Sequence, residues 1–367
     1  MGQIVSERLR VPACRLYRDE FGIHTFELTY FFSGPDGYSR IGQVWTFLTE
    51  SCKRFARNRH MFLLCHGLRA AMINTPGGQR LKMIVNPRVM VDGEEGYLGI
   101  TDCRSKVLDR CKFAFDWFWA SHGLSFIKMD FCLLTRVDLC MGIEFLEPFS
   151  IPGYLDLLKR TPHRTNYHLE RLEDEADEQH SFKIANKSRG LVVYDKMYEQ
   201  RRFSPRQGET DRILMRVEYQ LYSNGLRKLA REKDLINKRE LLRWILRHAP
   251  ELFCEGISSC LAAEPYRSQE KVKAEINRQT SWRPETKTRM LWAQQYLYHT
   301  GDYDSLVQMM REENRLAELQ VIRERYHQLG ISPATLRKRS GLLYLPSLPA
   351  LVLSALYRHY EEGSESS

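Results

Sequence analysis

Three segments of this 367-residue chain alternate apolar and polar side chains with a period of two. They read LTRVDLCMG at 134–142, GLVVYDKM at 190–197 and ILMRVEYQLY at 213–222. This period is typical of a β-strand with one buried face, because successive side chains point to opposite faces of a sheet. The pattern predicts three strands whose second face carries charged groups and a tyrosine.

If the three strands are neighbours in one sheet, a single surface collects their polar residues: Arg136, Asp138, Tyr194, Lys196, Arg216 and Glu218. Carboxylates bind Mg²⁺ or Mn²⁺ through hard oxygen atoms, and the cations can neutralise phosphate oxygens. A tyrosine hydroxyl is a poor nucleophile at pH 7 unless a cation or metal favours the phenolate. The surface therefore indicates phosphate chemistry, with Asp138 and Glu218 near a shared cation. The alternative is a solvated face held by cross-strand salt bridges.

The remaining segments predict a mixed N-terminal part and a helical C-terminal part. Expected strands are 23–32, 80–91 stopping at Asn86-Pro87, the pair 125–133 and 134–145, a pair around 181–196, and 212–222. Expected helices are 42–57, 101–121 with Thr101 or Asp102 as N-cap, 151–160, and much of the chain after about 226. The fold class expected is α+β. A domain at 1–225 would hold a central, mostly antiparallel sheet flanked by helices, and 226–367 would form a helical DNA-binding or accessory region.

Composition favours a polyanionic partner and a cytoplasmic location. Lys and Arg total 55 against 46 Asp and Glu, a net charge of +9. The N-terminus MGQIVSERLRVPACRLYRDE has no apolar signal core, no apolar tract is long enough to span a membrane, and the nine cysteines include no CxxC pair. We therefore expect reduced thiols and no membrane association. The acidic run ERLEDEADE at 170–178 is expected to be an exposed, mobile loop, because it repels itself.

The order of three motifs resembles that of rolling-circle replication initiators. The motifs are TRVDL at 135–139, ANKSRGLVVYDKMYE at 185–199 and LMRVEYQL at 214–221. They are similar to the R-[IL]-D strand, the strand ending in Y-x-K with a carboxylate after it, and the R-[FV]-E strand of the filamentous-phage gene II/X family and of related initiators of Gram-positive plasmids. The resemblance covers residues 20–225 and, with fewer matches, 290–330.

This resemblance implies an enzyme that nicks and rejoins one DNA strand at an origin, with Mg²⁺ or Mn²⁺ as cofactor. Tyr194 would be the nucleophile that stays linked to the 5′ phosphate. The metal would be held by Asp138, Glu218, Glu27 and Glu199, while Lys196 would assist and Arg136 and Arg216 would contact DNA. The implied partners are origin duplex, single-stranded DNA, a host helicase and a second copy of the chain.

Two details of the tyrosine segment stay open in the sequence. Tyr198 is a second candidate nucleophile; on a strand its hydroxyl would lie about 13 Å from that of Tyr194, and on a helix the two would share a face. Glu199 lies an odd number of residues from Tyr194, so it joins the site only if the strand bulges or ends first.

The sequence also departs from the family pattern. The segment 82–85 supplies no acid before Asn86-Pro87, where these initiators usually have one, and no two histidines form an H-x-H pair. An all-carboxylate metal site is therefore the version expected. The alternative function is a non-catalytic DNA-binding protein derived from such an initiator.

The segment ERYHQLGISPATLRKRSGL at 324–342 suggests a second DNA contact. Gly330 is expected to end one helix, and Ser332 with Pro333 to begin the next. The second helix would carry Arg337, Lys338 and Arg339 into a major groove, as in a helix-turn-helix. A helical hairpin with a solvated basic end fits the same segment.

Overall fold

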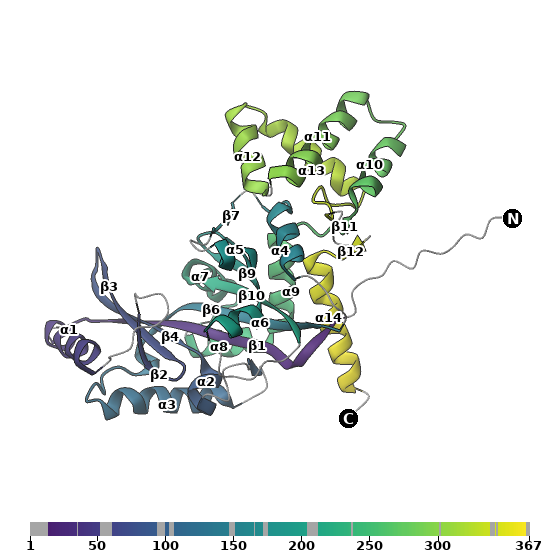
Figure 1. Cartoon of the computed structure of the whole chain (residues 1–367). Helices are drawn as coiled ribbons and strands as arrows, with labels where there is room; N and C mark the ends of the chain where they lie inside the picture. The colour runs from purple at the N-terminus through teal and green to yellow at the C-terminus, as the bar shows by residue number, and fades with distance from the viewer. Residues whose placement is uncertain are drawn as a thin grey trace.

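The computed structural model describes residues 14–34, 36–51, 61–93, 100–102, 106–146, 151–164, 166–171, 175–203, 212–235, 238–300, 302–337, 342 and 344–364. A large antiparallel sheet occupies the N-terminal half and helices dominate the C-terminal region, which confirms the expected α+β class (Figure 1). Among these residues, no helix combines the length and the apolar character that a membrane span requires.

The main sheet has ten strands, and its central strands are β1, β6, β10 and β9 in spatial order. The full path is β2-β3-β4-β1-β6-β10-β9-β8-β7, with β5 paired to β1. The bounds are β1 (Cys14–Phe31), β2 (Phe62–Cys65), β3 (Leu68–Thr75), β4 (Gly78–Val85), β5 (Thr101–Asp102), β6 (Leu133–Phe145), β7 (His168–Leu169), β8 (Ser181–Ala185), β9 (Arg189–Asp195) and β10 (Ile213–Tyr222). The three charged strands predicted from the sequence are therefore adjacent, with β10 between β6 and β9.

One face of the central strands is apolar and forms the larger core. Val137, Val193 and Val217 are fully buried on it, and burial of a side chain of this size stabilises the fold by about 1.5–3 kcal/mol. The helices that share this core include α3 (Val107–Ser121), α4 (Ile151–Arg160), α7 (Ser223–Glu232), α8 (Lys238–Arg247), α9 (Ala249–Cys260) and α14 (Leu348–Ser364). The apolar side chains of each strand thus pack against helices, and the polar side chains lie on the opposite face of the sheet.

A second core lies in a helical unit at one end of the molecule (Figure 1). It is built by α10 (Gln269–Arg278), α11 (Pro284–Thr300), α12 (Tyr303–Glu312) and α13 (Leu316–Gln328). The packing does not separate at residue 226, where the expected second region begins, because α7, α8 and α9 belong to the core of the sheet.

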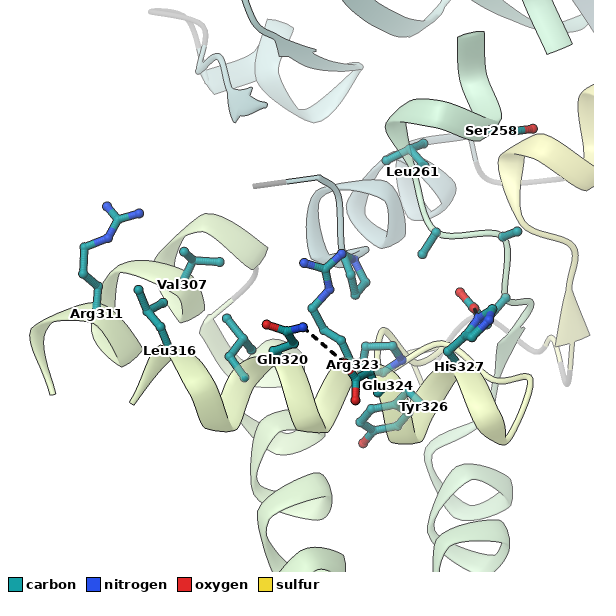
Figure 2. A pocket seen from close by; sticks show the side chains of 16 residues that line it. Ser258, Leu261, Val307, Arg311, Leu316, Gln320, Arg323, Glu324, Tyr326 and His327 are labelled. Atoms are coloured by element: carbon teal, nitrogen blue, oxygen red, sulfur yellow. Dashed lines mark hydrogen bonds and ion pairs between the residues drawn. The ribbon is translucent and has the colours of Figure 1, made fainter. Parts of the chain in front are cut away.

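A cleft of about 760 Å³ lies between the end of α9 and α13, with Leu261 on one side and Gln320 and Arg323 on the other (Figure 2).

Several predicted boundaries are wrong, and contacts with other elements explain two of them. Residues 125–132 are not a strand, because Asp116 accepts the backbone N–H of Met129 at 2.7 Å and holds this segment, with its short 3₁₀ turn (Met129–Phe131), against α3. The helix expected from 101 begins at Val107, since Thr101 and Asp102 pair with β1 as β5 and do not cap. The helix expected at 42–57 is α1 (Gly37–Thr46), continued by a π-turn (Phe47–Ser51), and residues 52–60 lie outside the described ranges.

By contrast, the predicted stop at Asn86-Pro87 is confirmed. β4 ends at Val85, and the side chain of Asn86 accepts the backbone N–H of Val89 at 3.0 Å as the N-cap of α2 (Pro87–Asp92). Proline at the first helical position needs no hydrogen-bond partner for its nitrogen, which favours a helix start.

The acidic run, expected to be a mobile loop, is helical from residue 175, although residues 170 and 171 lie in no helix or strand. Residues Glu175–Gln179 form the short helix α5. Asp177 pairs with Arg202 at 2.7 Å and Glu178 with Lys159 at 3.8 Å. Cations from α4 and from the helix after β9 thus offset the self-repulsion that the run has in isolation.

The predicted helix-turn-helix is wrong for residues 331–337. Gly330 does end α13, with φ +60°, but the following segment is not helical and bends at Pro333 and Ala334. The backbone N–H of Ser332 donates to Pro265 and that of Leu336 to Arg267, beside the small sheet of β11 (Tyr266–Arg267) and β12 (Tyr344–Leu345). The N–H of Leu336, which would make the first bond of a new helix to the carbonyl of Ser332, is used by Arg267 instead.

Of the three basic residues expected on that helix, the structure describes Arg337. Arg337 pairs with Asp156 of α4 at 3.2 Å and donates to the carbonyl of Tyr298 at 2.6 Å. It thus joins the helical unit to α4 instead of presenting a free basic end. Lys338 and Arg339 lie outside the described residues.

Gly256 tests the packing of α9 on the sheet. A methyl group at this position would lie 2.5 Å from ring carbons of the buried Tyr219 on β10. We expect Gly256→Ala to lower the free energy of unfolding by about 1–3 kcal/mol, because overpacking displaces the helix or the ring. Urea denaturation measures the change. Gly42→Ala in α1, which meets no atom within 4 Å, is the control and is expected not to destabilise. Equal stability of Gly256→Ala and wild type would contradict this packing.

Candidate functional site

Four successive strands place one polar side chain each in a row on the polar face of the sheet. They are His24 of β1, Cys140 of β6, Glu218 of β10 and Tyr194 of β9. Glu218 lies directly opposite Cys140 in the β6–β10 pairing, and Tyr194 lies opposite Arg216 in the β9–β10 pairing. The hydroxyl of Tyr194 donates a hydrogen bond of 2.8 Å to Oε1 of Glu218. The row brings the predicted nucleophile into contact with a predicted metal ligand.

His24 enters this row through a β-bulge. In the β1–β6 pairing, Ile23 faces Leu139 and Thr25 faces Asp138, so His24 is an extra residue without a partner position. Its Nδ1 atom lies 2.9 Å from Oε1 of Glu218. His24 was not predicted as a site residue, because strict alternation puts it on the apolar face. One signal was present: Ile23 is apolar but in phase with Thr25, so the alternation already fails there.

Glu218 is ionised throughout the neutral range. Burial raises its pKa, but the charge and hydrogen bond of His24, the hydrogen bond from Tyr194 and the charge of Arg216 outweigh burial and lower the pKa to about 2. Burial, followed by the charges of Glu218 and Glu199, raises the pKa of Tyr194 well above its ordinary value. The resting site therefore holds a neutral phenol against a carboxylate, and added positive charge is needed to form the phenolate.

Asp138 lies on the same face as Glu218, two residues along β6 from Cys140. Burial and the charge of Glu218 raise the pKa of Asp138, although Arg136 and the hydroxyl of Thr25 oppose this. Arg136 Nε lies 3.0 Å from Asp138 Oδ1, and Thr25 donates to Oδ2. Both carboxylate oxygens are thus engaged by protein groups.

Glu27, the ligand expected from the first strand, is enclosed by cations. Lys82 Nζ lies 2.8 Å from Glu27 Oε2 and Arg136 lies 3.6 Å from it, while the hydroxyl of Thr135 donates to Oε1 at 2.8 Å. Lys82 belongs to the segment where the resembling family carries an acid. A salt bridge therefore takes the place of a second carboxylate at this end of the site.

Lys196 and Glu199 reach the site because β9 ends before them. The side chain of Asp195 accepts the backbone N–H groups of Met197 and Tyr198, each at 3.0 Å, and starts helix α6 (Lys196–Phe203). In the helix Lys196 Nζ lies 2.7 Å from Glu199 Oε2 and 5.9 Å from the ring centre of Tyr194. The sequence allowed Glu199 to join the site only if the strand bulged or ended before it. β9 ends at Asp195, so this condition is met.

Tyr198 has contacts that differ from those of Tyr194. Its ring stacks on His180 at 3.7 Å between ring centres, and its hydroxyl accepts a hydrogen bond of 2.8 Å from Arg202. Because Tyr198 lies in α6, the separation of about 13 Å expected between the two tyrosine hydroxyls on a strand does not apply. The two tyrosines are held by different partners on different elements.

Two arginines expected to contact DNA are occupied within the protein. Arg216 is 0% exposed, and its charge acts on Tyr194 and Glu218. Arg136 pairs with Asp138 and Glu27, as described above. Both arginines contribute positive charge to the site. For Arg136, the alternative expected from the sequence, a cross-strand salt bridge, is what the structure has.

One group of described residues could hold a metal ion. His24, Cys140 and Glu218 each offer one ligand atom, and these atoms lie within 4.8 Å of one another. Of the predicted carboxylate ligands, this group contains Glu218. Its other two members, His24 and Cys140, offer an imidazole and a thiol. This group differs from the expected all-carboxylate site, because the bulge in β1 supplies a histidine.

No protein-family model, curated protein sequence or solved structure matches this chain. What the site can do follows from its own geometry.

Proposed function

We propose that this chain nicks and rejoins one strand of DNA, with Tyr194 as the nucleophile. The observation that carries the proposal is the 2.8 Å hydrogen bond from the Tyr194 hydroxyl to Glu218, within a row of ionisable groups at the end of a strand. The motif resemblance supports DNA as the substrate, and the net charge of +9 favours a polyanion.

In the nicking step, the phenolic oxygen of Tyr194 attacks a backbone phosphorus and the bond from phosphorus to the 3′ oxygen breaks. The phenolic proton passes to solvent, and the leaving 3′ oxygen takes up a proton to become a hydroxyl. The DNA is then joined to Tyr194 through its 5′ phosphate. In rejoining, the 3′ hydroxyl attacks that phosphate and releases the tyrosine, so no phosphodiester is lost.

The residues around Tyr194 have distinct roles in this proposal. Glu218 orients the hydroxyl, and Arg216 supplies positive charge near the phenol. Lys196, paired with Glu199, lies beside the Tyr194 ring, where it can move toward an incoming phosphate. A divalent cation held at Glu218, Mg²⁺ or Mn²⁺ by resemblance, would lower the pKa of the phenol and neutralise the phosphate.

The proposal extends to the biological setting. An origin in duplex or single-stranded form would be the substrate, in the cytoplasm, with a host helicase and a second copy of the chain as partners. Tyr198 keeps the role of second candidate nucleophile. The resemblance implies Asp138 and Glu27 as metal ligands, but their carboxylates are paired with Arg136 and Lys82.

A second candidate is a DNA-binding protein without catalysis. The salt bridge from Lys82 to Glu27 favours it, because a cation is present where the family has an acid. The following test separates the two candidates.

The test is formation of a covalent protein–DNA adduct on a denaturing gel. Single-stranded oligonucleotides labelled at either end, and supercoiled plasmid, are incubated with the protein and Mg²⁺, Mn²⁺ or Zn²⁺ in turn. The 3′-labelled part is expected to migrate with the protein and the 5′-labelled part to run free. DNA binding without an adduct under every metal would establish the second candidate.

Binding to single-stranded DNA is expected to weaken with salt. Each phosphate contact by a cation contributes a slope of about 0.7 in log affinity against log salt. We expect a total slope of about 2 or more, corresponding to roughly three contacts or more, in fluorescence anisotropy. A salt-independent affinity would rule out both candidates.

A further inference from the structure

We propose that His24, Cys140 and Glu218 form a binding site for Zn²⁺, in which a cysteine thiolate selects against Mg²⁺. The binding itself is independent of the nicking activity; its use in catalysis rests on the proposed function.

The sheet preorganises the three ligand atoms. Glu218 and Cys140 are directly opposed across β10 and β6, where Cβ atoms lie about 4.5–5.5 Å apart. The bulge in β1 delivers His24 from the other side of β6, to within 2.9 Å of Glu218. All three atoms lie within 4.8 Å of one another, while ligands about 2.0–2.3 Å from a tetrahedral metal are roughly 3.5 Å apart. His24 keeps 20% of its side chain exposed, so a small rotation can close the difference.

The donor set selects the metal. Imidazole, thiolate and carboxylate are the ligands of zinc sites, whereas Mg²⁺ prefers oxygen atoms in octahedral geometry. Asp138, the nearby carboxylate that could make the site richer in oxygen, is engaged by Arg136 and Thr25. Three protein ligands leave a fourth position open, as in catalytic zinc sites.

Metal binding requires ligand atoms without protons. On binding, the thiol of Cys140 loses its proton to solvent, and the His24 nitrogen that binds the metal must likewise carry no proton. His24 and Glu218 exchange their mutual contact for bonds to the metal. The ion would then lie beside Glu218, which the Tyr194 hydroxyl contacts.

The experiment is a titration of the full-length protein with Co²⁺, which replaces Zn²⁺ and is coloured. We expect one Co²⁺ per chain and a sulfur-to-cobalt charge-transfer band in the near ultraviolet. Cys140→Ser should lose this band, and stoichiometric Zn²⁺ should remove it from wild type, while excess Mg²⁺ should leave it unchanged. Cys254→Ser is the matched control and should keep the band, because Cys254 lies on α9, which packs against the opposite face of the sheet.

Three results would overturn the proposal: no Co²⁺ binding, a charge-transfer band that persists in Cys140→Ser, or displacement of Co²⁺ by Mg²⁺. If circular dichroism shows that Cys140→Ser does not fold, His24→Asn replaces it. His24 is partly exposed, and its loss should weaken Co²⁺ binding at least about tenfold, as the loss of one ligand implies. Unchanged Co²⁺ affinity in that variant would equally contradict the site.

The outcomes for binding and nicking are separable. A chain that binds Co²⁺ through Cys140 but forms no DNA adduct has the metal site without the proposed function. If Cys140→Ser nicks DNA as well as wild type does with Mg²⁺, the chain has the proposed function and this metal site plays no role in it.

Discussion

Tyr194→Phe is expected to abolish the covalent adduct while leaving folding and DNA binding close to wild type. The change removes the attacking oxygen and keeps the ring. Glu218 loses one hydrogen bond but retains its contact with His24 at 2.9 Å. The loss of one such bond costs about 0.5–1.5 kcal/mol, or a little more because its acceptor is charged. Adduct formation, thermal denaturation and fluorescence anisotropy measure the three properties.

Tyr198→Phe is the matched control. Its ring can still stack on His180, and the change removes only the oxygen that Arg202 contacts. We expect adduct formation within a few fold of wild type. If Tyr198→Phe loses the adduct and Tyr194→Phe keeps it, the nucleophile has been assigned to the wrong tyrosine.

Glu218→Gln is expected to reduce the rate of adduct formation at least about a hundredfold, the scale of removing one positioned group from an active site. The substitution keeps the volume but removes the charge that orients Tyr194 and that a metal would need. Stability should also fall, because the buried cation Arg216 loses a charge that acts on it. Single-turnover kinetics and urea denaturation check the two effects. Wild-type kinetics in this variant would exclude Glu218 from the reaction.

The same variant tests the electrostatics through pH. The pKa of Glu218 in the folded protein, about 2, lies below its ordinary value of 4.5. A lowered carboxyl pKa stabilises the fold above the ordinary value, and this contribution disappears as the pH falls through the lowered one. The difference of about 2.5 units corresponds to about 3 kcal/mol. The stability gap between wild type and Glu218→Gln should therefore narrow between about pH 5 and pH 2. A gap that is constant over this range would contradict the lowered pKa.

The sequence by itself determined the fold class and the charged strands. Alternation in β6, β9 and β10 follows from a local rule, since a strand packed on one side must repeat every two residues. The stop of β4 at Asn86 is also local, because an N-cap side chain and a proline act on their immediate neighbours. These features need no knowledge of distant contacts.

The tertiary structure decided which residues meet at the site. His24 is moved to the polar face by a bulge whose position depends on the pairing of β1 with β6, more than 100 residues apart. Lys82 pairs with Glu27 across β4 and β1, and the helix expected at Ser332 is replaced by a non-helical segment bonded to Pro265 and Arg267. In each case a long-range hydrogen bond or ion pair outweighs the local preference, because a buried polar group must find a partner wherever the fold supplies one.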